Sequence, residues 1–124
     1  MTKTPMILVV EDDVWLAEQH VRTLRAAGFQ AEHVPLALAA IDSVDTKHPA
    51  AIILDVFLSG PNAFTLLHEL QSHSDLAAIP VILCTNSAED IAGEDLEAYG
   101  IAQVLDKTTM KPTDLVAAIK KALP

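Results

Sequence analysis

The residues in this sequence best suited to chemistry are carboxylates that follow apolar runs. Glu11, Asp12 and Asp13 come directly after one such run, and Asp55 comes directly after another. Clustered carboxylates repel each other, and burying an unpaired charge is costly. A divalent cation relieves that cost, and Mg²⁺ prefers one or two carboxylates together with waters and a phosphate oxygen. One carboxylate facing such an ion can act as a nucleophile toward phosphorus and form an acyl phosphate.

Two further residues, Thr85 and Lys107, stand near the ends of later apolar runs and suit the same chemistry. A hydroxyl donates one hydrogen bond to a phosphoryl oxygen, and an ammonium group adds a compact positive charge. Taken singly, each has a plainer interpretation. Thr85 fits a turn, Lys107 fits a solvated surface, and the acidic triplet fits a helix N-terminus capped by Asp13.

The elements that must position these residues alternate along the chain. Continuous apolar runs rich in β-branched residues predict strands buried on both faces, and apolar residues three or four apart predict helices. Strictly alternating strands and helices predict a parallel sheet covered on both faces, with its site at the carboxyl ends of the strands. The predicted strands are 6–10, 31–36, 50–54, 80–84 and 101–105, and the predicted helices start near 14, 38, 63, 88 and 115, the first of them ending before Gly28.

Length and composition narrow the class of protein. The chain has 124 residues, 51% of them hydrophobic and 20% charged, which indicates one folded domain over residues 1–124. Its net charge of −9 argues against binding to nucleic acid or to anionic membranes. The longest apolar runs are far shorter than the roughly 20 residues of a membrane helix. A single cysteine, Cys84, and an N-terminus unlike a signal peptide predict a cytoplasmic location.

The pattern resembles the receiver domain of two-component response regulators. The residues that carry the resemblance are Glu11-Asp12 after Ile-Leu-Val-Val, Asp55 after Ile-Ile-Leu, Thr85 after Val-Ile-Leu-Cys, and Lys107 near the end of Gly-Ile-Ala-Gln-Val-Leu-Asp-Lys. They occur in the family's order and at its intervals over nearly the whole chain. Any one of them is a weak signal, whereas the set in register is specific.

The resemblance implies a fold and a function. The fold would be flavodoxin-like, a doubly wound five-stranded parallel sheet with strand order 2-1-3-4-5. Asp55 would accept a phosphoryl group from a phosphohistidine on a histidine kinase or histidine phosphotransfer protein. Mg²⁺ would be held by Glu11, Asp12, Asp55 and the backbone carbonyl of Phe57. Thr85 and Lys107 would contact the phosphoryl group, and phosphorylation would alter contacts with a downstream protein.

Several positions depart from the family pattern. Ser59 stands where a proline is usual after the acceptor, and Thr108 replaces the proline that usually follows the lysine in a cis bond, so we expect a trans bond there. Val104 occupies the switch position that normally carries an aromatic ring. A displaced Lys111-Pro112 pair offers a second candidate for the functional lysine, although its spacing is too long.

These departures leave a second function open, a phosphate-independent interaction module with the same fold. An aspartate-dependent phosphohydrolase of the haloacid dehalogenase type is rejected because Phe57 occupies the place of its second aspartate, and a nucleotide-binding site is rejected because no glycine-rich loop follows the first strand. The sequence favours, weakly, a stand-alone protein. The five histidines are interpreted as surface or rim residues, Cys84 as an inert core residue, and Trp15 as partly buried.

Overall fold

The computed structural model describes residues 4–35, 37–55, 63–73, 76–85 and 100–123. Its five strands are β1 (Met6–Val10), β2 (Gln30–Val34), β3 (Ala51–Asp55), β4 (Val81–Thr85) and β5 (Ile101–Asp106). The described helices are α1 (Val14–Ala26), α2 (Ala37–Lys47), α3 (Ala63–Gln71) and α4 (Pro112–Ala122). The predicted helix near 88–99 lies outside the described residues.

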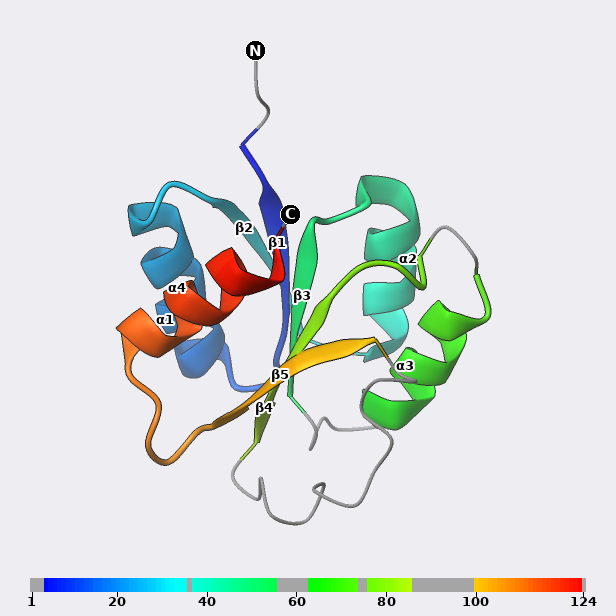
Figure 1. The fold of residues 1–124 in the computed structure, drawn as a ribbon. Helices are drawn as coiled ribbons and strands as arrows, with labels where there is room; N and C mark the ends of the chain where they lie inside the picture. The colour runs from blue at the N-terminus through cyan, green and yellow to red at the C-terminus, as the bar shows by residue number, and fades with distance from the viewer. Residues whose placement is uncertain (1–3, 36, 56–62, 74–75, 86–99, 124) are drawn as a thin grey trace.

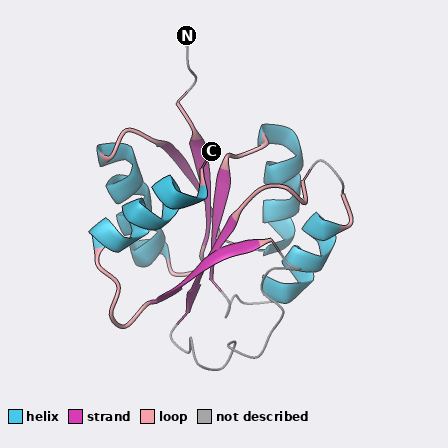
Figure 2. Ribbon diagram, in the orientation of Figure 1, coloured by secondary structure: helices cyan, strands magenta, loops and turns pink. Residues whose placement is uncertain are grey.

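The strands form one parallel sheet in the order β2-β1-β3-β4-β5. Helices α1 and α4 cover one face, and α2 and α3 cover the other (Figure 1; the strands and helices are coloured by type in Figure 2). The predicted fold class and strand order are therefore confirmed.

Alternation along the buried strands separates the core into two clusters. On β1, Ile7 and Val9 pack toward α1 and α4, whereas Leu8 and Val10 pack toward α2 and α3. Strands covered on both faces need apolar residues at consecutive positions, which is why β1, β3 and β4 read as uninterrupted apolar runs.

Helix α1 begins and ends with the residues expected of its termini. Asp13 is the N-cap, and its carboxylate accepts a hydrogen bond from the backbone N–H of Leu16 at 3.2 Å. At the other end Gly28 adopts a φ of +97°, a left-handed conformation that glycine tolerates without steric cost. The chain can then turn back into β2.

The apolar spacing that begins at Val14 predicts one buried face of α1, and the structure differs from expectation at three positions of this helix. Val14 is 53% exposed and Trp15 is 79% exposed, so the expected partial burial of Trp15 is wrong. His20 is only 6% exposed, so its interpretation as a surface or rim residue is also wrong. The buried residues of the helix are Ala17, His20 and Leu24, spaced three and four apart.

Among the described helices, none is long and apolar enough to cross a membrane.

Candidate functional site

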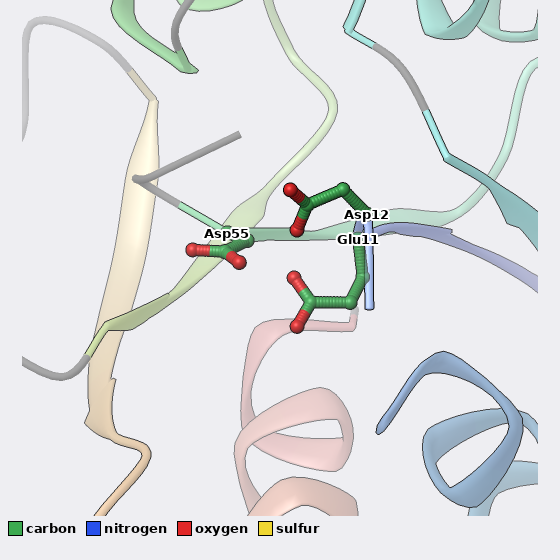
Figure 3. A group of neighbouring side chains, drawn as sticks. All are labelled: Glu11, Asp12 and Asp55. Carbon is green, nitrogen blue, oxygen red and sulfur yellow. The ribbon is translucent and has the colours of Figure 1, made fainter. Parts of the chain in front are cut away.

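Acidic residues from two segments meet where the carboxyl ends of the central strands β1 and β3 come together. Glu11 and Asp12 follow β1, and Asp55 is the last residue of β3, the neighbouring strand. One carboxylate oxygen from each of these three residues lies within 4.8 Å of the others. Figure 3 shows the three side chains directed toward one another across the end of the sheet. Asp13 instead caps α1. Of the three consecutive acids, Glu11 and Asp12 therefore lie in the cluster and Asp13 belongs to the helix terminus.

Lys107 joins two of these carboxylates. It follows β5, and its Nζ lies 2.6 Å from Asp55 Oδ2 and 2.9 Å from Glu11 Oε1. The Lys107 side chain is 12% exposed, and the side chains of Glu11 and Asp55 are less exposed still. Lys111, the competing candidate, is the exposed N-cap of α4. The geometry thus favours Lys107 over Lys111 as the lysine of the site.

Backbone contacts fix the position of Lys107. Its N–H donates to the carbonyl oxygen of Thr85 at 2.8 Å, which ties the end of β5 to the end of β4. Thr85 itself is fully buried at the last position of β4. The Asp106 carboxylate accepts hydrogen bonds from the backbone N–H and the hydroxyl of Thr108, and these bonds lower the pKa of Asp106. The Lys107–Thr108 bond is trans, as expected.

Burial changes the proton affinity of the cluster. Burial and the neighbouring Asp55 carboxylate raise the pKa of Glu11 to about 8, although Lys107 acts in the opposite direction. Burial by itself would lower the pKa of Lys107, but its hydrogen bonds to Asp55 and Glu11 outweigh burial and hold that pKa above its ordinary value. Lys107 is therefore an ammonium ion at neutral pH.

The cluster opens into a cavity of about 960 Å³ between α1 and the segment leading into α4. His20 lines it from α1, and burial lowers the pKa of His20 to about 4 with Lys107 contributing in the same direction. The imidazole is therefore neutral at physiological pH. A signal for its burial was available in the sequence, because His20 lies three residues after Ala17 and four before Leu24 on one helical face.

Two more expectations concern residues beside the site. Cys84 is buried in β4, and burial raises the pKa of its thiol to about 12, in keeping with an inert core residue. Val104 is half-buried on β5, opposite Leu83 of β4, and packs against the core on the α2 and α3 side. Phe57 and Ser59 lie outside the described residues.

Comparison with known proteins shows the family. The model of the response regulator receiver domain matches residues 7–120, and the chain belongs to this family. It is 32% identical over 120 residues to the transcriptional regulatory protein GltR of Pseudomonas aeruginosa, covering 94% of this chain and 48% of that protein. It is 30% identical over 122 residues to the DNA-binding response regulator MtrA of Mycobacterium tuberculosis, covering 98% and 52%. The chain thus spans about half the length of these relatives.

Solved structures agree with this assignment. The receiver domain of a signal transduction histidine kinase from Syntrophus aciditrophicus has a TM-score of 0.84 and 31% identity, covering 97% of this chain and 90% of that one. The receiver domain of the sensor histidine kinase PA1611 from Pseudomonas aeruginosa has a TM-score of 0.84 and 22% identity, covering 96% and 97%. That structure holds a magnesium ion in its active-site cleft. At 22% identity, the similarity to PA1611 supports the fold alone.

Proposed function

We propose that this receiver domain accepts a phosphoryl group on Asp55 from a phosphohistidine donor. The observation that carries the proposal is the placement of Asp55. Its carboxylate lies 2.6 Å from the ammonium group of Lys107 and within 4.8 Å of carboxylate oxygens of Glu11 and Asp12. A carboxylate at the end of a buried strand, beside a fixed cation and two further acids, is arranged for phosphoryl transfer and not for packing.

The residues present fit a magnesium ion. In the part of the chain that the structure describes, Glu11 Oε2 is buried and has no hydrogen-bond partner, which is a costly state for a carboxylate oxygen. The carboxylates of Glu11, Asp12 and Asp55 together form an all-oxygen donor set, the set that Mg²⁺ prefers. We propose that Glu11, Asp12 and Asp55 hold the ion, with the backbone carbonyl of Phe57 as a further ligand. Bound Mg²⁺ would neutralise negative charge on the phosphoryl oxygens.

The protein's own side chains account for the rest of the transfer. An oxygen of Asp55 forms the new bond to phosphorus as the N–P bond of the donor breaks. The electron pair of that bond goes to the imidazole nitrogen, which takes up a proton. Lys107 supplies positive charge beside Asp55, and the hydroxyl of Thr85 donates a hydrogen bond to a phosphoryl oxygen. The domain is a phosphoacceptor that assists its own modification.

The partners follow from this chemistry. The donor is a histidine kinase or a histidine phosphotransfer protein, and a downstream protein reads the phosphorylated state. We propose that residues 1–124 form one receiver domain in the cytoplasm. MtrA is a DNA-binding response regulator, and this chain matches only about half of MtrA. With a net charge of −9, the present chain is better suited to protein contacts than to nucleic acid.

The test is to incubate the protein with Mg²⁺ and a small acyl-phosphate donor and to measure its intact mass. The expected result is a gain of one phosphoryl group by the wild-type protein and none by Asp55→Asn, which keeps the shape of the side chain but removes the nucleophilic oxygen. Omitting Mg²⁺ should abolish the gain. No gain with any donor would support the phosphate-independent interaction module instead.

A further inference from the structure

His33 on β2 makes a contact with the site that the receiver pattern does not assign. Its Nε2 lies 2.7 Å from the backbone carbonyl oxygen of Glu11. Because a carbonyl oxygen can only accept, Nε2 carries the proton and donates this bond. His33 is half-buried, and Glu11 is 2% exposed. The bond is therefore shielded from competing water.

The contact stands where the regular strand pairing stops. The last paired residues of β1 and β2 are Val10 and Val34, and Pro35 follows. Beyond them the N–H of Glu11 donates to the carbonyl oxygen of Val34 at 3.2 Å. The carbonyl oxygen of Glu11 accepts its hydrogen bond from the His33 side chain, because the backbone pairing of β1 with β2 ends one residue earlier, at Val10. Both backbone groups of Glu11 are thus held by β2.

This arrangement bears directly on the acidic cluster. The carbonyl that His33 holds belongs to the peptide bond between Glu11 and Asp12, two of the three clustered carboxylate residues. Fixing that peptide fixes the directions in which both side chains leave the backbone. Groups that orient metal ligands through hydrogen bonds commonly change metal affinity by about 10–100-fold when removed.

We propose that His33 is a positioning residue of the magnesium site, which clamps the Glu11–Asp12 peptide so that both carboxylates face Asp55. The inference rests on the proposed function, because it assumes that these carboxylates bind Mg²⁺. The clamp itself is a property of the metal-free protein and can be measured without the ion.

The test compares three variants with the wild-type protein. His33→Val removes the donor but keeps a residue that favours strands. His33→Gln keeps an N–H donor near the same place. Glu32→Gln is the matched control, because it lies on the same strand and loses an exposed ion pair with Lys47 away from the site. Two quantities are measured: amide hydrogen exchange at Glu11 and Asp12 without metal, and the Mg²⁺ dissociation constant by calorimetry.

His33→Val should speed exchange at both amides and weaken Mg²⁺ binding about tenfold. His33→Gln should recover most of both losses, and Glu32→Gln should change neither. Wild-type exchange rates and affinity in His33→Val would overturn the proposal, as would a His33→Gln variant no better than His33→Val. If the wild-type protein fails to bind Mg²⁺, the proposed function fails, and the exchange rates still decide whether His33 holds the peptide.

Discussion

Lys107 Nζ lies 2.6 Å from Asp55 Oδ2, and only 12% of the lysine side chain is exposed. The same ammonium group contacts Glu11 Oε1 at 2.9 Å, so one cation stands between two buried carboxylates. It offsets the cost of burying negative charge at this end of the sheet. In the metal-free protein Lys107 therefore stabilises the fold as well as preparing the site.

Replacing Lys107 with methionine should destabilise the metal-free protein. Removing one partner of a buried ion pair costs about 3–5 kcal/mol, and we expect the lower end because Glu11 already holds a proton at neutral pH and so leaves less unpaired charge behind. The measurement is urea unfolding at neutral pH, with Lys121→Met on the exposed face of α4 as the control. Saturating Mg²⁺ should recover much of the loss, because the ion replaces the missing charge. A loss below about 1 kcal/mol would show that the pair contributes little.

Adjacent acids should have separate effects. Asp12→Ala should remove most Mg²⁺ affinity and most phosphorylation, because Asp12 belongs to the acidic cluster. Asp13→Ala should leave both nearly unchanged and lower the free energy of unfolding by about 1 kcal/mol, since it loses the helix cap to Leu16. Calorimetric Mg²⁺ titration and urea unfolding measure the two effects. Equal losses of Mg²⁺ affinity in both variants would mean that the wrong acid has been assigned to the metal.

Magnesium affinity should depend on pH through Glu11. Its pKa is raised to about 8, so in the metal-free protein the carboxyl holds a proton at neutral pH that a bound ion must displace. Affinity should therefore rise by up to about tenfold per pH unit below that pKa and level off above it. Glu11→Gln should bind Mg²⁺ more weakly, with little dependence on pH in this range. A wild-type dissociation constant that stays flat across the pKa would contradict this assignment.

Acid should destabilise the protein through His20. Its pKa is lowered from 6.5 to about 4, so between these values the unfolded chain binds a proton that the folded protein does not. The contribution of His20 to the free energy of unfolding is fully present above pH 6.5, and it falls by about 3 kcal/mol as the pH drops toward 4. The stability of His20→Leu relative to wild type should rise by that amount over the same range. Parallel stability curves for the two proteins would exclude the effect, and His73→Gln, at an exposed site, serves as the control.

Much of the fold and of the site could be predicted from the sequence. Strands of a parallel sheet that are buried on both faces require unbroken apolar runs, so β1, β3 and β4 can be predicted from the sequence. The residues that follow these strands must then meet at one edge of the sheet. Asp55 and Lys107 are predicted in this way, because the receiver spacing distinguishes Lys107 from an ordinary surface lysine.

Other features depend on packing that periodicity does not specify. Trp15 lies in the first turn of α1 and is exposed, because the buried face of that helix is set by Ala17, His20 and Leu24. Val14 also remains exposed, although it lies three residues before the buried Ala17 and so on the same helical face. The contact of His33 with Glu11 joins residues 22 positions apart and depends on where two strands stop pairing, for which the sequence carries no local signal.

The most direct test of the central claim locates the phosphoryl group on the chain. After reaction with a phosphodonor and Mg²⁺, borohydride reduces an acyl phosphate on aspartate to homoserine, and peptide mass spectrometry then identifies the altered residue. We predict homoserine at position 55, dependent on Mg²⁺, and unmodified residues at positions 11, 12 and 13. Modification at any of these three acids in place of Asp55, or modification of Asp55 that is the same without Mg²⁺, would contradict the proposed site.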